Sequence, residues 1–303
     1  MVGILLCTYN GEAFLRSQIE SFIDQTHKEW RLYVSDDGST DGTRDILKEY
    51  MQRLGTRMVV VDGPKKGFAQ NFMSLVRNQR ISCDYYAFSD QDDIWLPEKL
   101  ARSLAALESI SPDTPCLYCS RTRLINTHGV VIGQTPLFKN RPSFRNALVQ
   151  SLAGANTMVI NETARKLLTR TSHQATIIAH DWLTYMIVSG CGGIVIYDPE
   201  PSLLYRQHEG NVIGANAGFS NKVRRISKML KGRFREWNDK NLLILRGYSS
   251  ELTSENRRLL GSFDRRREGN IFARISLMKT GRLYRQTIAG NISLYIALLL
   301  KQI

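Results

Sequence analysis

Short apolar runs alternate with stretches of helical periodicity through the first ninety residues. The apolar runs lie at residues 2–8, 30–35, 57–61 and 85–89. Stretches with apolar side chains every three or four positions lie at residues 13–23, 46–54 and 67–79. The runs are too short for buried helices and are typical of strands, whereas the periodic stretches are typical of helices. Strands that alternate with helices of this length predict an α/β fold with a mainly parallel central sheet flanked by helices.

Polar residues stand at the ends of three of the four expected strands. They occupy residues 8–10, 36–37 and 90–93. Ligands of open α/β folds bind at the carboxyl ends of the strands, so the three groups are expected to form one site. Carboxylates gathered at one edge without a ligand would repel one another. The pattern therefore favours a binding site over a purely solvated edge.

The most acidic of these groups, Asp90, Asp92 and Asp93, directly follows an apolar strand. A hard divalent ion prefers oxygen ligands and would neutralise this cluster while carrying a nucleotide's phosphates. The alternative is a solvated turn that caps the helix expected from Pro97, since Asp and Pro favour helix starts. Both interpretations stay open on this stretch alone.

The pattern is less regular between residues 97 and 208. Helices are expected at residues 97–107, 143–151, 161–168 and 180–189. Strands are expected at residues 116–125, 154–160, 193–197 and 203–206, with a turn at 127–133. Cys116 and Cys119 form a Cys-x-x-Cys pair within an expected strand, without a second pair for zinc. Two packed thiols are therefore expected there.

The charge of the chain is strongly asymmetric. Its net charge is +13, with 41 Lys and Arg against 28 Asp and Glu. Residues 1–218 balance to zero, so residues 219–303 carry the whole excess. In residues 219–235 basic and apolar side chains interleave, which predicts a basic amphipathic helix that binds a membrane surface. An ordinary helical subdomain with a solvated basic face is the alternative, and nucleic acid is disfavoured because the chain carries none of the usual binding motifs.

The sequence opens with a strand-like run and not with a basic segment followed by an apolar core, so no secretory signal is expected. No apolar run reaches the roughly 18 residues of a membrane-spanning helix. The five cysteines show no disulfide-rich pattern. A reducing, cytoplasmic location is therefore the expectation.

Three motifs at matching spacing resemble those of the family 2 glycosyltransferases, which have a GT-A-type nucleotide-binding fold. They are LCTYNG at residues 6–11, SDDGSTDGT at 35–43 and SDQDDIW at 89–95. The resemblance covers residues 1–215 as a catalytic domain, and leaves 216–303 as a basic, mainly helical C-terminal region. Within the family, GFAQNF at 67–72 and YRQH at 205–208 are most similar to bacterial rhamnosyltransferases.

The resemblance implies a set of nucleotide-sugar-binding residues. They are Thr8, Tyr9, Glu12, Asp36, Asp37, Gly67, Asn71, Asp90 and Asp93. Tyr9 would stack on the base, because an aromatic face binds a base plane without reading its edges, although a plain turn residue is the alternative. Asp37, with Asp36 beside it, would accept the N3–H of uracil or thymine. Charge at the start of a helix also accounts for this pair.

The same resemblance implies the metal ligands and the catalytic base. Asp92 would bind Mg²⁺ or Mn²⁺ directly, and His208 would contact the ion or the diphosphate, unless it is a surface-loop histidine. Asp181 would be the general base, although its position also suits a helix N-cap. His180 stands where the family often has an acidic residue, which leaves the acceptor side less defined.

Together these features predict an inverting, metal-dependent transferase. It would move a sugar from dTDP-rhamnose or a UDP-sugar to a hydroxyl of a lipid-linked glycan at the cytoplasmic membrane face. Two rivals are a non-catalytic nucleotide or polyanion binder and a nucleotidyltransferase. A pure binder has no use for a base such as Asp181, and a nucleotidyltransferase needs a basic phosphate loop that residues 8–14 lack.

Overall fold

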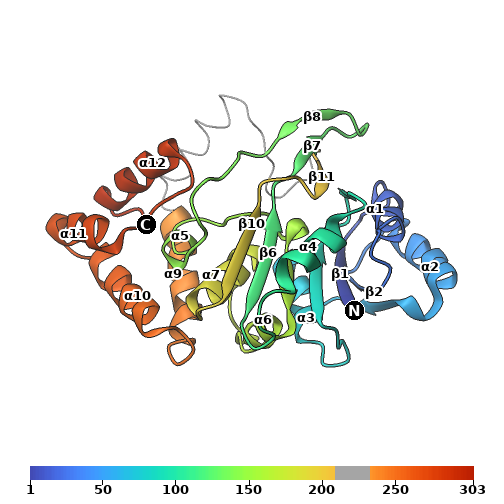
Figure 1. Ribbon diagram of the computed structural model, residues 1–303, viewed down its shortest axis with the longest axis horizontal. Helices are drawn as coiled ribbons and strands as arrows, with labels where there is room; N and C mark the ends of the chain where they lie inside the picture. Colours follow the sequence, from blue (N-terminus) through green and yellow to red (C-terminus); the bar gives the residue numbers. More distant parts are fainter. Residues whose placement is uncertain (209–232) are drawn as a thin grey trace. The chain divides into compact units, whose positions relative to one another are not determined.

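A computed structural model describes residues 1–208 and 233–303 (Figure 1). The described residues form two compact units. Unit 1 comprises residues 1–137, 153–170 and 194–208, and unit 2 comprises residues 138–152, 171–193 and 233–303. The expected boundary at 215/216 and most of the expected amphipathic helix at 219–235 lie outside the described residues.

Unit 1 contains a seven-stranded sheet with the strand order β10-β6-β9-β4-β1-β2-β3. The strands are β1 Val2–Thr8, β2 Trp30–Asp36, β3 Met58–Asp62, β4 Tyr85–Ser89, β6 Cys116–Ser120, β9 Val159–Asn161 and β10 Ile194–Asp198. All neighbouring pairs are parallel except those of β9, which runs antiparallel to both β4 and β6. The sheet is therefore mixed but mainly parallel, which confirms the predicted α/β fold.

Helices cover both faces of this sheet. The helices of unit 1 are α1 Leu15–Ile23, α2 Thr43–Leu54, α3 Phe68–Arg77, α4 Lys99–Leu107 and α6 Glu162–Thr169. Alternate residues of β1 such as Ile4 and Leu6 share a buried core with α1, α2 and α4. Helices α3 and α6 contact each other and the strands from the opposite face. Because side chains alternate across a strand, β1 must be apolar throughout, as its sequence is.

A second, four-stranded sheet in unit 1 has the order β5-β11-β7-β8. Its strands are β5 Ile94–Trp95, β7 Arg123–Ile125, β8 Val131–Gln134 and β11 Leu203–Arg206. The single strand expected at residues 116–125 is wrong, because the chain bends at Arg121–Thr122 and places β6 and β7 in different sheets. The bend lies in a run of four polar residues, Ser120–Arg123, which interrupts the apolar pattern.

Two further expectations in this region are wrong in detail. The turn expected at residues 127–133 closes early, and its second half pairs with β7 as β8. The strand expected at 154–160 begins as a 3₁₀ turn, η2 Ala155–Thr157, before β9. A second 3₁₀ turn, η1 Gly55–Arg57, joins α2 to β3.

Unit 2 is helical over its described residues. Its helices are α5 Phe144–Ala147, α7 His180–Gly190, α9 Arg233–Arg246, α10 Ser254–Arg267, α11 Ile271–Gly281 and α12 Ile288–Leu299. The side chains of Thr253, Asn270 and Thr287 each accept a backbone N–H at the start of α10, α11 and α12. Such caps satisfy donors that a helix leaves free at its first turn. The predicted helical C-terminal region is thus confirmed for residues 233–303.

The cysteine expectation is confirmed: Cys116 and Cys119 are buried thiols on β6. Burial raises the pKa of Cys116 to about 11, so it stays protonated. Among the residues that the structure describes, no helix has the length and apolarity needed to cross a membrane.

Candidate active site

The register of the parallel strands brings the polar strand ends of unit 1 together. Thr8 of β1 is paired with Asp36 of β2, and Asp36 with Asp62 of β3. On the other side of β1, Leu6 is paired with Ser89, the last residue of β4. The loops that follow β1, β2 and β4 therefore leave the same edge of the sheet, as the sequence predicted.

Gln91 fixes the β1 loop to the β4 loop. Its Oε1 accepts the Tyr9 N–H at 2.8 Å, and its Nε2 donates to the Tyr9 carbonyl at 2.9 Å. The Tyr9 backbone is thus held at both ends while its side chain stays 58% exposed. An immobilised backbone that presents an open aromatic ring suits the stacking role expected for Tyr9. Sequence reasoning missed Gln91, although it lies between two of the acidic residues that attracted attention.

Asn10 joins the β1 loop to the β2 loop. Its N–H donates to Ser39 Oγ at 2.9 Å, and its Oδ1 accepts the Thr40 N–H at 2.8 Å. The residue has φ 48°, a left-handed conformation that Asn adopts more readily than most residues. Thr8 Oγ1 adds a buried bond to Asp36 Oδ1 at 2.9 Å. Glu12 lies close by, and its Oε2 accepts the N–H of Gly42 at the start of α2 at 2.9 Å.

Asp36 anchors the β2 loop from within the protein. It is buried, and its carboxylate accepts hydrogen bonds from Thr8, Ser39 and Arg44. Burial alone would raise the pKa of Asp36, but these hydrogen bonds lower the pKa overall, so it is a stable carboxylate. Protein groups bind both of its oxygens, so Asp36 stabilises the β2 loop in this structure. The nucleotide-sugar contact expected for Asp36 stays a prediction.

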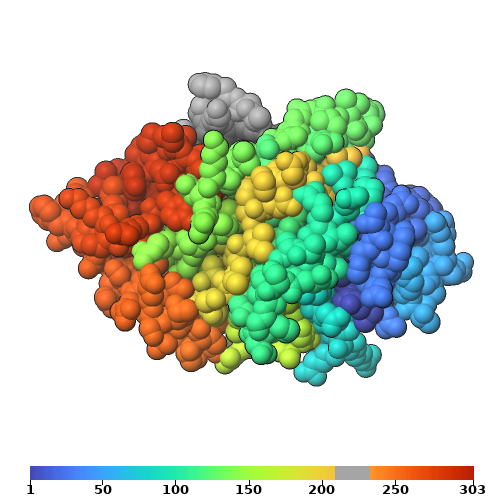
Figure 2. All heavy atoms as spheres, viewed as in Figure 1, coloured from blue at the N-terminus to red at the C-terminus, as the bar shows by residue number. Residues whose placement is uncertain are grey.

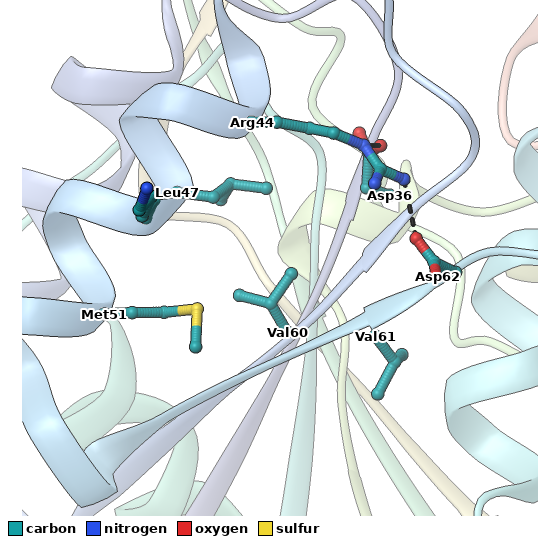
Figure 3. A pocket seen from close by; sticks show the side chains of 8 residues that line it. Asp36, Arg44, Leu47, Met51, Val60, Val61 and Asp62 are labelled. Atoms are coloured by element: carbon teal, nitrogen blue, oxygen red, sulfur yellow. Dashed lines mark hydrogen bonds and ion pairs between the residues drawn. The ribbon is translucent and has the colours of Figure 1, made fainter.

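Arg44 bridges Asp36 to Asp62, with Nε 2.8 Å from Asp36 Oδ2 and Nη2 2.6 Å from Asp62 Oδ1 (Figure 3). This ion-pair triad closes one end of a pocket of about 200 Å³ between α2 and β3. The rest of the wall is mainly aliphatic and includes Leu47, Met51 and Val60. None of the predicted nucleotide-binding residues except Asp36 lines it, so this pocket is separate from the loops that carry Tyr9 and Asp92.

Asp37 organises the segment between β3 and α3. Its Oδ1 accepts the Lys65 N–H at 2.6 Å, and its Oδ2 accepts the Gly67 N–H at 2.9 Å. Gly67 has φ 83° and precedes α3, which explains the choice of glycine. Each carboxylate oxygen has a second lone pair, so Asp37 is still able to accept a base N–H.

Gly63 and Asn71 complete the packing around Asp37. A Cβ on Gly63 would lie 2.9 Å from the Asp37 Cα and 2.7 Å from Asn71 Oδ1, so only glycine fits. Asn71 is buried, and its amide binds Ser35. Its Nδ2 donates to the Ser35 carbonyl at 2.9 Å, and its Oδ1 accepts from Ser35 Oγ at 2.6 Å. The nucleotide contact expected for Asn71 also stays a prediction. The role of Gly63 was not predicted, because a single glycine in the sequence does not indicate a close backbone approach.

Asp93 is the internal member of the acidic group. It is fully buried, with Oδ2 accepting from Asn156 at 2.5 Å and Oδ1 accepting the Arg206 N–H at 3.1 Å. Burial, and then the charges of Asp92 and Asp90, raise the pKa of Asp93 well above its usual range. The carboxyl is enclosed by protein, so its structural function is to tie the β4 loop to β11.

Asp92 and His208 form a close pair near the surface. His208 Nε2 lies 2.8 Å from Asp92 Oδ2, and both side chains are slightly less than one-fifth exposed. The rings of His208 and Phe14 have centroids 5.3 Å apart, which supports the imidazole from the α1 side. The structure thus brings together the two residues predicted as metal ligands, although 115 residues separate them in the sequence.

Arg206 supports this pair through two contacts, with the backbone of Asp92 and with the ring of Phe14. It is buried, its Nε donates to the Asp92 carbonyl at 3.0 Å, and its guanidinium lies 4.6 Å from the centroid of the Phe14 ring. Nη1 also donates to the Thr127 carbonyl at 3.1 Å. One side chain therefore fixes the backbone that presents Asp92. Sequence reasoning included Arg206 only as part of a resemblance.

The donor set of Asp92 and His208 fits a divalent cation. Two ligands that bind an octahedral ion at about 2.1 Å and at a right angle to each other lie about 3 Å apart, close to the separation found here. A carboxylate oxygen with an imidazole nitrogen suits Mn²⁺, and Mg²⁺ would rely more on the carboxylate. Within residues 1–208 and 233–303 no three His, Cys, Asp or Glu side chains gather as a complete metal cage, so further ligands would have to come from the diphosphate and water.

Asp181 belongs to unit 2 and lies in the first turn of α7. The N-cap of this helix is Ala179, so the alternative in which Asp181 is the N-cap is wrong. Its Oδ1 accepts the Trp182 N–H at 2.7 Å and its Oδ2 accepts from Ser151 Oγ at 3.4 Å. Burial raises the pKa of Asp181 to about 6, against the smaller opposite effect of these bonds. A carboxylate that titrates near neutrality is suited to accepting a proton.

The preceding residue, His180, does not supply a second charge beside Asp181. It is buried, and burial lowers its pKa to about 3, so the imidazole is neutral at physiological pH. The family resemblance left the consequence of a histidine at this position undefined. The structure shows that this histidine belongs to the core of unit 2, where it adds no charge to the acceptor side.

Comparison with known proteins places the chain in a family, and the match covers most of unit 1 but not Asp181 or His208. The model of the family "Glycosyl transferase family 2" matches residues 3–167, more than half of the chain. The chain is 28% identical to the dTDP-rhamnosyl transferase RfbG of Shigella flexneri, over 73% of this chain and 78% of that protein. It is 35% identical to the putative teichuronic acid biosynthesis glycosyltransferase TuaG of Bacillus subtilis, over 34% of this chain and 40% of that protein.

Solved structures share the fold. S. aureus TarS in complex with UDP-GlcNAc superposes with a TM-score of 0.56 at 16% identity, covering 99% of this chain and 90% of that chain. The mannosyltransferase PcManGT from Pyrobaculum calidifontis, in complex with GDP-Man and Mn²⁺, gives 0.55 at 15% identity, covering 99% and 85%. With the family match, these likenesses show that the chain belongs to glycosyl transferase family 2 and folds as a GT-A-type transferase of nucleotide-sugars.

Proposed function

We propose that this enzyme transfers rhamnose from dTDP-rhamnose to a hydroxyl of a glycan on a lipid carrier, in the synthesis of a bacterial cell-surface polysaccharide. The observation that carries the proposal is the Asp92–His208 pair, which lies beside the loops of Tyr9 and Asp37 at the end of the parallel sheet. The named activity of the Shigella relative supports dTDP-rhamnose as donor. A UDP-hexose is the second candidate donor, supported by the UDP-GlcNAc complex of TarS.

Residues of unit 1 would hold the donor. Tyr9 would stack on the base, and Asp37 would accept the N3–H that thymine and uracil share. Asp90 would bind the ribose or the sugar. Asp92 and His208 would hold Mg²⁺ or Mn²⁺, which would supply positive charge to the diphosphate as it leaves.

Asp181 would act on the acceptor. Its carboxylate would take the proton of the acceptor hydroxyl while that oxygen forms a bond to the anomeric carbon. The bond between the anomeric carbon and the diphosphate oxygen would break at the same time, and the nucleoside diphosphate would leave with the electron pair. One direct displacement inverts the anomeric configuration. The pKa of about 6 leaves most of this carboxylate ionised at neutral pH.

The location follows from the acceptor. A lipid-linked glycan presents its hydroxyls at the cytoplasmic face of the membrane, so the enzyme would work there as a peripheral protein. The positive charge of residues 219–303 would favour anionic headgroups, with up to about 1 kcal/mol for each basic residue close to the surface. Nucleic acid is not proposed as a partner.

The test is a donor-selection experiment with purified full-length protein. Calorimetry with dTDP and with UDP, each with and without Mn²⁺, ranks the bases and measures metal dependence. Product analysis with dTDP-rhamnose and UDP-hexoses, using a synthetic lipid-diphosphate glycan acceptor, then identifies the sugar and the anomeric configuration. Tighter binding of dTDP and an inverted rhamnoside would support the proposal. Transfer from a UDP-hexose alone would overturn the rhamnose assignment, and a retained configuration would overturn the role of Asp181.

A further inference from the structure

Helix α12 of unit 2 has an unusual composition for a surface helix. Residues 286–300 contain no charged side chain. The inner face of the helix is formed by Leu294, Ala297 and Leu298, which are completely buried. A surface helix normally pairs such a face with a polar one, and a helix that is apolar all round is normally enclosed.

The outer face of α12 is also apolar. Its large exposed residues are Ile288, Ile292, Tyr295, Ile296, Leu299 and Leu300. The spacing places the first five on one side of the helix, and we call all six the α12 ridge. Ile288 is 81% exposed and Ile292 is 56% exposed. Figure 2 shows the C-terminal helices, coloured red, at the molecular surface. A contiguous patch of this kind marks an interaction site.

The sequence around the ridge is strongly basic, and Lys301, next to the ridge residue Leu300, has Glu268 as an acidic partner at 3.3 Å. Residues 269–303 contain five Lys and Arg and no Asp or Glu. Lys279 and Arg282, at the end of α11, are both exposed. A second copy of the chain that docked ridge to ridge would place these like charges on the same interface. An anionic lipid surface is complementary to both the apolar ridge and the exposed cations at the end of α11, the helix that contacts α12.

The length of α12 decides between crossing the membrane and lying on it. Its 12 residues extend for about 18 Å, well short of the roughly 30 Å of a hydrocarbon core. We infer that α12 lies in the plane of an anionic bilayer with its ridge inserted among the acyl chains, and that Lys279 and Arg282 contact the headgroups. The inference rests on the proposed function only in that a lipid-linked acceptor gives the docking a purpose.

A vesicle-binding experiment with the full-length chain tests this inference. The test variant combines Ile288→Gln, Ile292→Gln and Ile296→Gln, which removes apolar area without changing the charge and without lowering helix propensity. The matched control combines Met51→Gln on α2 with Leu243→Gln on α9, two large apolar residues that are exposed outside the ridge. Flotation with vesicles of phosphatidylglycerol and phosphatidylcholine measures the partition constant, and circular dichroism verifies that each variant is folded.

We expect wild type and control to float with the anionic vesicles and the ridge variant to lose at least tenfold in partition constant. A variant with Lys279→Gln and Arg282→Asn should bind the anionic vesicles several-fold more weakly at low salt. At high salt the difference should be small, because salt screens exposed charges. In Tyr295→Trp, the added fluorescence should be quenched by brominated acyl chains.

Equal flotation of wild type and the ridge variant would overturn the inference. So would a ridge-dependent dimer in sedimentation that does not bind vesicles, since the occupant would then be a second copy. Binding of dTDP and UDP, measured on the same variants, separates the two proposals. Ridge-dependent flotation without binding of dTDP or UDP would overturn both proposed donors and leave the membrane-surface inference intact.

Discussion

His208 Nε2 lies 2.8 Å from Asp92 Oδ2, across two strands that the sequence separates by more than a hundred residues. Asp92 follows β4, and His208 follows β11 in the smaller sheet. Arg206, two residues before the histidine, donates to the Asp92 carbonyl. The antiparallel pairing of β11 with β5 makes this meeting a consequence of the fold, because it brings the end of β11 to Asp92 and Asp93, the residues just before β5.

This pair predicts a metal-dependent nucleotide site. Asp92→Ala and His208→Ala should each weaken Mn²⁺-dependent dTDP binding, by at least tenfold for the carboxylate and less for the imidazole. Calorimetry at fixed Mn²⁺ measures the change. Asp84→Asn is the matched control, because Asp84 is an exposed carboxylate of the same unit that pairs with the N-terminus. Metal-dependent binding of normal strength in Asp92→Ala would remove this residue from the site.

The stacking role of Tyr9 makes a second prediction. Tyr9→Ala should weaken binding of dTDP and UDP alike by about fivefold to 150-fold, since stacking on one base contributes about 1–3 kcal/mol. Tyr9→Phe keeps the ring and should bind normally. Gln91→Ala removes the two bonds that hold the Tyr9 backbone and should give an intermediate loss. A Tyr9→Ala variant with wild-type affinity would leave Tyr9 as a turn residue.

Asp181 predicts opposite effects on turnover and on stability. Its pKa of about 6 lies above the ordinary 3.9 of an unfolded chain, so the folded state holds the proton more tightly. The ionised side chain therefore opposes folding, increasingly as the pH rises from about 4 to about 6 and fully above that, by on the order of 3 kcal/mol. Asp181→Asn should raise the melting temperature at pH 8 and leave it nearly unchanged at pH 4.

Turnover should follow the same ionisation. In wild type, kcat/KM should rise with pH and level off above about 6, because only the ionised carboxylate accepts the proton. Asp181→Asn should lose transfer by a factor of about 10² or more while it binds dTDP normally. Ser151→Ala is the control, since it removes one weak bond to Asp181 but keeps the carboxylate. Transfer by Asp181→Asn at a rate near wild type would assign the base to another residue.

The sequence predicted the frame of unit 1 well because local and global signals agree there. The apolar runs of β1, β2 and β4 are buried on both faces, and the polar residues begin where each strand ends. The bend at Arg121–Thr122 left a signal in the four polar residues Ser120–Arg123, but that signal does not say that the next strand joins another sheet. Hydrophobic pattern reports burial, and it does not report the sheet to which a strand belongs.

The candidate site was predictable in part for a similar reason. Chemistry-bearing residues such as Asp92 and His208 were found through their types and their resemblance to a family. Residues that act through geometry were missed: Gln91 is an ordinary amide and Gly63 an ordinary glycine until the loops are brought together. Asp36 shows the opposite case. It was predicted to bind the nucleotide-sugar, but its carboxylate accepts hydrogen bonds from Thr8, Ser39 and Arg44 inside the protein.

Arg206 gives a final prediction, as a positioning residue for Asp92. Its guanidinium packs on Phe14 and donates to three backbone carbonyls, a geometry that needs a planar, multiply donating group. Arg206→Lys keeps the charge but loses this fork, so it should weaken Mn²⁺-dependent dTDP binding by about tenfold. Arg206→Met should weaken it further and lower the melting temperature, because buried carbonyls would lose their partners.

Arg102→Lys is the control, an arginine of the same unit that pairs with Asp198 away from Asp92. If Arg206 only stabilised the fold, Arg206→Lys would lower the melting temperature but bind dTDP with the same Mn²⁺ dependence as wild type. A positioning role requires the Mn²⁺ dependence itself to change.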